Sequence, residues 1–294
     1  MLMDWPVIQV EVGKENYSKL LLQIPDPPKR LYCRGNISLL NNSCFAVVGT
    51  RKLTSYGKET AQQIVRDLAN NEFTVVSGLA LGIDAVAHQT TLDCGGKTIA
   101  VLGGGVGDKN IAPRTNFTLA QSILKNDGLL ISEYSDKENI FAFNFAVRDR
   151  IISGLSLGVL VIEADEKSGA LITAKCALDQ NRDVFAVPGS VLSPKSVGPN
   201  TLIQNGAKLV MNGYDIINEY RENLKLFSEK KSGVLTKNPT EKKIVDLLSE
   251  HGILFVDDII RRSGMETSAV SVSLSMLEIR GAIKHLGNGK YRKI

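Results

Sequence analysis

Between residues 45 and 210, short apolar runs alternate with stretches whose apolar residues recur at helical spacing. Helical patterns such as 58–69 and 170–180 lie between these runs. Strands that are apolar on both faces and alternate with amphipathic helices indicate a parallel sheet covered on both sides. The pattern therefore predicts an α/β protein with a doubly wound, mostly parallel sheet. The predicted strands are 45–48, 73–76, 98–102, 129–132, 159–163, 184–187 and 208–210.

The remaining chain divides into a lead-in, a linker and a second domain. Residues 1–44 are rich in turn formers, and we expect them to pack along the sheet formed by the domain at 45–222. A charged stretch with Ser and Gly, 223–238, reads as a linker. Within 239–294, three helical patterns precede two short strands around Gly287-Asn288-Gly289, the order of a winged helix. A small module without DNA contacts is the alternative reading of this domain.

Composition narrows the class of protein only mildly. The 294 residues include 35 Lys and Arg and 31 Asp and Glu, which gives a net charge of +4. This charge permits a polyanionic partner without establishing one. Four well-separated cysteines and three histidines favour neither a disulfide framework nor a metal site. No uncharged apolar stretch of about 18 residues occurs, so we expect no membrane association, and the cysteine usage favours the cytoplasm.

Two strand-to-helix turns carry the strongest chemical signal. Ser77, Gly78 and Gly82 follow one apolar run, and Arg51 follows another after Gly49-Thr50. A helix that begins at such a turn leaves its first N–H groups free to bind an anion, and an arginine can fork onto a phosphate. The alternatives are a tight turn required by the fold and a salt bridge of Arg51 to a neighbouring acid.

Further phosphate candidates lie at the same expected edge of the sheet. Two arginines flank Asp149 at an expected helix start, which suggests a clamp for consecutive phosphates. A second helix whose N-terminus could bind an anion is expected after Glu163. Asp84 and His88, four residues apart, are interpreted as a pair that braces one helix rather than as a catalytic pair. The additional candidates are Arg114, Asn116, Arg148, Arg150, Lys167, Ser168 and Thr173.

Aromatic residues are scarce along this edge. The spacing of Phe141, Phe143 and Phe145 suits one face of an extended segment, where packing beneath a loop is preferred over stacking on bases. Binding that rests mainly on phosphates predicts weak sequence preference and strong salt dependence.

Six segments, in this order, resemble the DprA (Smf) family of DNA-processing proteins. The resemblance spans 17–219, and the tail is similar to the winged-helix extension of that family. It implies an extended Rossmann-like domain that binds single-stranded DNA, protects incoming or processed DNA and loads a RecA-type recombinase in natural transformation. It also implies no catalysis, no cofactor, and a homodimer through Ile203, Gln204 and Leu209. The segments are 48–51, 77–88, 148–154, 161–174, 184–189 and 198–207.

This chain departs from the family pattern in places. Asp149 stands where the family usually has Asn, which places a carboxylate beside the expected phosphates unless the residue caps a helix. Ala112 replaces a tyrosine that precedes Asn116 in the family, and the loop before it is longer.

Two other function classes remain as alternatives. Nucleoside monophosphate phosphoribohydrolases hold a nucleotide at a comparable helix terminus, but their Pro-Gly-Gly-x-Gly-Thr motif with a following glutamate is reduced here to Gly103-Gly104-Gly105. A transcription regulator would sense a nucleotide in the large domain and bind duplex DNA through the tail. Duplex contact through the winged helix therefore stays open.

Overall fold

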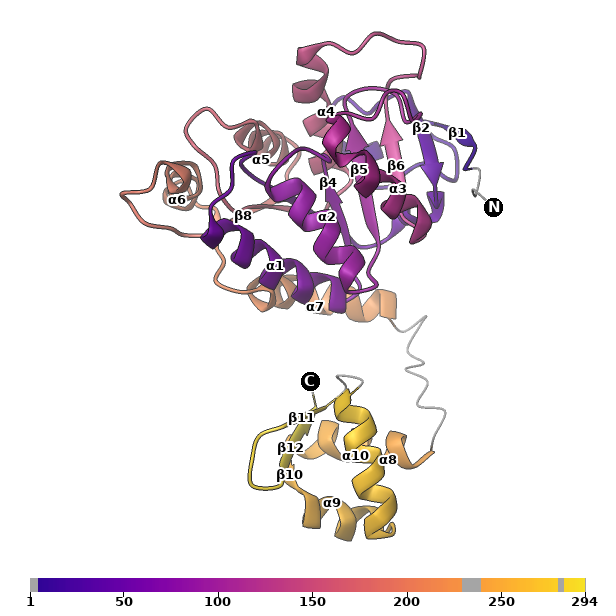
Figure 1. Cartoon of the computed structure of the whole chain (residues 1–294), viewed down its shortest axis with the longest axis vertical. Coiled ribbons are helices and arrows are strands. Elements are labelled where there is room, and N and C mark those ends of the chain that lie inside the picture. The colour runs from indigo at the N-terminus through magenta and orange to yellow at the C-terminus, as the bar shows by residue number, and fades with distance from the viewer. Residues whose placement is uncertain (1–4, 229–238, 280–282, 294) are drawn as a thin grey trace. The chain divides into compact units, whose positions relative to one another are not determined.

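The computed structural model describes residues 5–228, 239–279 and 283–293 (Figure 1). The chain divides into two compact units, Met1–Lys225 and Leu226–Ile294. In the first unit, nine described strands form one sheet in the order β1-β2-β6-β5-β4-β3-β7-β8-β9. The strands are β1 (Val7–Glu11), β2 (Arg30–Gly35), β3 (Cys44–Val48), β4 (Thr74–Ser77), β5 (Thr98–Leu102), β6 (Leu129–Ser132), β7 (Gly158–Val161), β8 (Asp183–Ala186) and β9 (Lys208–Leu209).

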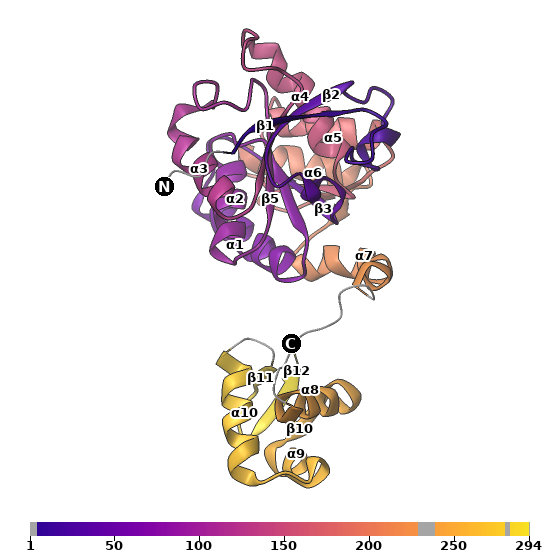
Figure 2. The same ribbon diagram turned by 90° about the vertical axis from the view of Figure 1, so that its right-hand side faces the viewer.

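Strands β3 to β9 are parallel, and helices cover both faces of the sheet (Figures 1 and 2). Alternate residues of each strand enter opposite core layers: Phe45 and Val47 pack in one layer, and Ala46 and Val48 in the other. This confirms the predicted doubly wound α/β fold. The helices are α1 (Ser55–Asn70), α2 (Ile83–Asp93), α3 (Phe117–Lys125), α4 (Ala142–Gly154), α5 (Gly169–Asp179), α6 (Val197–Gln204) and α7 (Gly213–Ser228).

The lead-in belongs to the sheet itself. β1 pairs with β2, and β2 pairs with β6, both antiparallel, so residues 7–35 extend the sheet beyond its parallel part. Leu31 and Cys33 are buried while Arg30 is exposed, the alternation of a strand with one covered face. At the other end of the unit, α7 continues through Ser228, so residues 223–228 of the predicted linker are helical. Residues 229–238 of the predicted linker lie outside the described part of the chain.

The second unit has the predicted winged-helix order. Helices α8 (Pro239–His251), α9 (Val256–Ser263) and α10 (Thr267–Ile279) enclose a core that includes Ile244, Ile259 and Leu274. β10 (Ile253–Phe255), β11 (Ile283–His285) and β12 (Lys290–Lys293) form an antiparallel sheet in the order β10-β12-β11. The three-residue strand β10 was not predicted, because so short a run shows no periodicity. No described helix of either unit has the length and apolarity that crossing a membrane requires.

Candidate nucleic-acid interface

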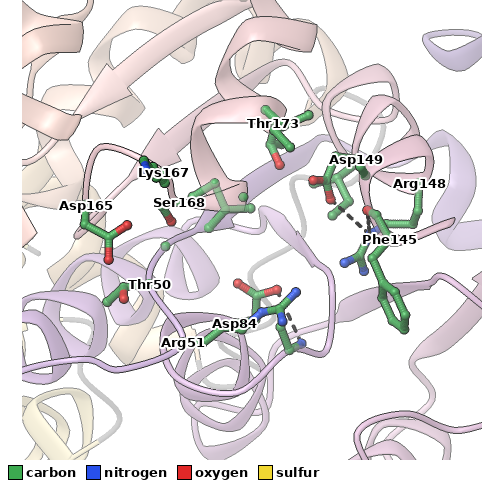
Figure 3. Close-up of a pocket in the computed structure, with 18 of the residues that line it drawn as sticks. Thr50, Arg51, Asp84, Phe145, Arg148, Asp149, Asp165, Lys167, Ser168 and Thr173 are labelled. Atoms are coloured by element: carbon green, nitrogen blue, oxygen red, sulfur yellow. Dashed lines mark hydrogen bonds and ion pairs between the residues drawn. The ribbon is translucent and has the colours of Figure 1, made fainter. Parts of the chain in front are cut away.

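A cavity of about 560 Å³ opens where β3 and β7 lie side by side. From β3 the chain runs outward through β4, β5 and β6, and it then returns to place β7 on the other side of β3. Ligands of doubly wound sheets bind beyond the carboxyl ends of the strands at such a reversal point. The cavity is lined by the turn after β3, the loop before α2, the side of α4, the segment 165–173 and Lys195 (Figure 3).

Arg51 lies on the turn that follows β3. Its side chain is exposed and forms no hydrogen bond or ion pair with residues that the structure describes. The turn beneath it is fixed by buried Glu163, whose backbone oxygen accepts from Thr50 N at 2.6 Å and whose carboxylate accepts from Thr54 N at 2.9 Å. Gly82 (φ 80°) lies so close to Thr50 that a Cβ would overlap its carbonyl oxygen. These contacts fix the turn, which therefore presents the unpaired guanidinium of Arg51 to the cavity.

The start of α5 forms the opposite wall. Ser168 occupies the N-cap position without a side-chain capping bond, and Gly169 and Ala170 follow it on the cavity lining. The first N–H groups of a helix lack intrahelical partners and carry partial positive charge. Lys167 is exposed beside them, and Figure 3 shows buried Thr173 directed toward the same space. This wall offers the donors that a phosphate needs.

Arg148 is buried, with 5% of its surface exposed, and its guanidinium forms hydrogen bonds within the protein. Its guanidinium donates to Gly78 O at 2.7 Å, to Val101 O, and to the Asp149 carboxylate at 3.0 Å. Gly78 has no space for a Cβ because the guanidinium occupies it. Arg148 therefore joins α4 to the ends of β4 and β5, and only its edge reaches the cavity.

Two acids next to Arg148 have raised pKa values. Burial raises the pKa of Asp149 to about 6, and the positive charge of Arg148 partly opposes this rise. Burial also raises the pKa of Asp84, which accepts from Gly78 N at 3.0 Å and Ala80 N at 3.4 Å. Asp84 thus ties the loop before α2 to its helix, but it forms no hydrogen bond with His88, its predicted partner. His88 bonds Thr98 at 2.7 Å between ring Nδ1 and hydroxyl, and burial lowers its pKa to about 3.

The expectation that Arg148 and Arg150 form a phosphate clamp at a helix start is wrong. Residues 148–150 lie in the second half of α4, which begins at Ala142, so Asp149 is not a helix cap. Arg150 lies outside the cavity lining and pairs with Glu133 at 2.8 Å and Asp26 at 3.1 Å. The alternating phenylalanines before Arg148 are typical of an extended segment, but the structure has a helix there. On this helix Ala142, Phe143 and Ala146 are exposed, and Phe145 is partly buried.

Other predicted residues stabilise the surroundings of the cavity. Ser77 is fully buried and donates to Val47 O at 2.7 Å. Asn116 is buried and donates to Leu79 O at 2.9 Å and Ala80 O at 3.1 Å, which holds the loop before α2. Arg114 lies outside the lining, bonded to Asp108 O and stacked over Phe117 at 4.5 Å from the ring centre. Of the predicted set, the cavity brings together Arg51, Arg148, Lys167, Ser168 and Thr173.

Sequence reasoning missed several lining residues. Lys52 adjoins Arg51 in the sequence, and its positive charge could have identified it as a further phosphate candidate. Lys195 enters from a distant segment and pairs with Asp165 at 2.9 Å, and no local pattern pointed to it. Five cations and three acids therefore line the cavity: Arg51, Lys52, Arg148, Lys167 and Lys195 against Asp84, Asp149 and Asp165.

An aromatic pair stands at the start of α4. Phe141 and Phe143 stack on each other with ring centres 5.6 Å apart and planes 9° apart, and they are 53% and 63% exposed. Phe145, on the same helix, lines the cavity and packs against Gly103. The preferred interpretation, that all three pack beneath a loop, is wrong for the first two.

These features define a class of protein: a Rossmann-like domain with a cationic cavity at the reversal point of its sheet, followed by a winged-helix domain. The family model of DNA recombination-mediator protein A matches residues 9–221, and the model of the DprA winged helix domain matches residues 230–289. The chain belongs to this DprA/Smf family, as its motifs predicted.

Relatives match over most of the chain. Protein Smf of Escherichia coli K12 is 37% identical over 289 residues, which cover 96% of this chain and 76% of that protein. The solved structure of DNA processing protein A from Streptococcus pneumoniae is 42% identical with a TM-score of 0.68, covering 74% of this chain and 75% of that one. The Helicobacter pylori structure of DNA processing protein A is 31% identical with a TM-score of 0.66, covering 76% of this chain and 99% of that one, and it is described as showing a unique single-stranded DNA binding mode.

Proposed function

We propose that this protein binds single-stranded DNA in the cavity between β3 and β7. The observation that carries the proposal is an unpaired, exposed Arg51 facing the uncapped start of α5 across a cavity whose lining cations outnumber its acids. Guanidinium groups and free helix N–H groups are the donors that phosphates accept from in proteins. The Helicobacter pylori relative, whose structure is described in terms of a single-stranded DNA binding mode, supports the choice of ligand.

The shape of the site favours an unpaired strand. A concave cavity takes up a base or a phosphate of a flexible strand, whereas the bases of a duplex are stacked and must be flipped out before they enter a pocket. Phe141 and Phe143 offer exposed ring faces beside the cavity, on the helix whose Ala142 and Phe145 line it. Aromatic faces stack on bases with little sequence preference, so the protein binds strands of any sequence.

The role is binding rather than catalysis. Each acid of the lining already has a partner: Asp84 accepts from backbone N–H groups, Asp149 from Arg148, and Asp165 from Lys195. A general base needs a free carboxylate or imidazole within reach of its substrate. We therefore assign the lining acids to positioning.

The finer role follows from family membership. As a DprA/Smf protein, the chain is proposed to act in the cytoplasm, to protect incoming or processed DNA, and to load a RecA-type recombinase onto the strand during transformation or recombination. It is further proposed to form a homodimer at the β9 edge of the sheet, through Ile203, Gln204 and Leu209, which would let one strand occupy two cavities.

The test of the cavity is the affinity of Arg51→Ala for a fluorescent oligothymidine, measured by anisotropy over a salt series. Loss of one charge-assisted contact is expected to cost about 1.5–3 kcal/mol, which is roughly a tenfold to 150-fold weaker affinity. Lys167→Ala is expected to weaken binding in the same direction. The matched control is Arg66→Ala, an exposed arginine on α1 outside the cavity lining, which should bind like the wild type. Equal affinities of the Arg51→Ala and wild-type proteins would refute the site.

A further inference from the structure

The sheet of the winged-helix unit has an outer face that its core does not use. In an antiparallel pair, directly opposed residues project from the same face. Ile253 opposes Arg292, Phe255 opposes Lys290, and Lys284 opposes Arg292. Leu254 and Ile283 project to the other side and are buried in the core. We call the outer set the wing sheet face: Ile253, Phe255, Lys284, Leu286, Lys290 and Arg292.

This face combines cations with apolar side chains and contains no acid. Phe255 is 46% exposed and Ile253 is 55% exposed. Lys290 lies over the Phe255 ring with its Nζ 4.9 Å from the ring centre. Within the part of the chain that the structure describes, Lys284, Lys290 and Arg292 form no ion pair. An exposed aromatic ring on the same sheet face as three cations that form no ion pair suits a ligand that carries both phosphates and exposed ring faces.

The helix that winged-helix proteins place in the major groove has the opposite character. α10 occupies that position, directly before the hairpin. Its sequence, Thr-Ser-Ala-Val-Ser-Val-Ser-Leu-Ser-Met-Leu-Glu-Ile, contains no lysine or arginine and one acid, Glu278. Phosphate contacts position a reading helix on a duplex, and cationic side chains supply most of that affinity. α10 offers none, so docking on duplex DNA through this helix is disfavoured.

We infer that the wing sheet face is a second binding site for single-stranded DNA. Lys284, Lys290 and Arg292 contact phosphates, and the Phe255 ring packs against an unpaired base. A duplex keeps its bases stacked, so it would engage the cations and leave the apolar half of the face exposed. The inference rests on the proposed function for the identity of its ligand, but it uses no residue of the cavity.

Two sites on one chain have a measurable consequence. An oligonucleotide of about 8 nucleotides fits a single binding module, whereas one of about 40 nucleotides can contact both and gains affinity through the effective concentration of the second site. The wing sheet face should therefore contribute to the affinity for the long strand and add little for the short one.

The test uses the full chain with two matched double variants. Lys284→Ala with Arg292→Ala removes two cations of the face, and Lys242→Ala with Lys243→Ala removes two exposed cations of α8. Each lost phosphate contact lowers the salt slope for single strands by about 0.7, so the first variant should lose about 1.4 from the slope on the long strand. The α8 variant should retain the wild-type slope.

A third variant separates stacking from charge. Phe255→Leu keeps an apolar side chain and removes the ring, so the affinity for the long strand should fall about fivefold or more while the salt slope stays constant. Because this substitution conserves the apolar character of a half-exposed site, it also covers the case in which a double variant fails to fold, which circular dichroism reports.

The outcomes separate the inference from the proposed function. A loss confined to duplex binding would mean that the face takes duplex DNA, and unchanged DNA binding in all face variants would leave a protein as its partner; either result overturns the inference. Both leave the proposed function standing as long as Arg51→Ala weakens the short oligonucleotide. If the wild type binds neither oligonucleotide, the proposed function itself fails.

Discussion

Asp149 is a cavity residue whose charge changes at mildly acidic pH. Burial raises the pKa of its carboxyl to about 6, against an ordinary value of 3.8, despite the adjacent Arg148. The carboxyl is therefore largely neutral at about pH 5 and charged at about pH 7. A carboxylate on the lining repels phosphate, so its protonation should strengthen DNA binding.

The affinity of the wild type for single-stranded DNA should increase as the pH falls from about 7 to about 5, and Asp149→Asn should remove most of this dependence. The variant should also bind more tightly at about pH 7, by roughly threefold to tenfold, because it lacks the repelling charge. Anisotropy titrations of both proteins at constant ionic strength measure this. Parallel pH profiles for the two proteins would mean that Asp149 does not face the bound strand.

The same shift affects folding with a defined sign. A carboxyl whose pKa is higher in the folded than in the unfolded chain binds protons more tightly when folded, so its effect on stability becomes less favourable as pH rises from about 4 to about 6. The free energy of unfolding of the wild type should therefore fall relative to that of Asp149→Asn across this window. Urea denaturation at the two ends of the window provides an independent check on the pKa.

At the scale of the element, one guanidinium connects α4 to the sheet by hydrogen bonds, in addition to the apolar packing of Ile151 and Ile152. Arg148 joins α4 to the carbonyl group of Gly78, directly after β4, and to that of Val101 in the neighbouring strand β5. Removal of Arg148 leaves these buried carbonyls and Asp149 without their donor. Arg148→Ala is therefore expected to lower the free energy of unfolding by about 3–5 kcal/mol.

Arg51→Ala is the comparison for this variant, because exposed Arg51 lacks such partners, and its free energy of unfolding should stay within about 0.5 kcal/mol of the wild-type value. Urea denaturation distinguishes the two arginines: one stabilises the fold, the other binds the strand. If Arg148→Ala were as stable as the wild type but weak in DNA binding, Arg148 would instead be a phosphate ligand.

Some elements were predictable from the sequence, and others were not. Strands β3 to β8 are buried on both faces, so their apolar runs predicted them to within about one or two residues at their ends. β1 and β2 are only partly buried and lie next to prolines, so they show no continuous apolar run. The role of Arg148 depends on carbonyl groups 70 and 47 residues away in the chain. The spacing of neighbouring residues in the sequence does not reveal such contacts.

At the scale of the whole molecule, the β9 edge remains open to another chain. β9 pairs only with β8 among the described strands, Leu209 is 45% exposed, and Met211 beyond it is 70% exposed. An edge strand flanked by exposed apolar side chains is a ready site for self-association. This agrees with the proposed dimer through Ile203, Gln204 and Leu209.

Ile203→Glu should convert a dimer at tens of micromolar protein into a folded monomer, as measured by sedimentation velocity. Its affinity for a short oligonucleotide should persist, while that for a long one should fall roughly tenfold or more as the second cavity is lost. Ile8→Glu places the same charge on β1 at the opposite edge of the sheet and should leave the oligomeric state unchanged. A monomeric wild type would exclude this interface.

Hydrogen exchange of the full chain with and without single-stranded DNA tests the cavity most directly. Bound phosphate should protect the amides of residues 49–52 and 167–170, which face each other across the cavity, and leave those of α3 unchanged. The same protection should be absent in Arg51→Ala at equal DNA concentration. Protection located elsewhere in the first unit, with residues 49–52 and 167–170 exchanging as in the free protein, would contradict the account.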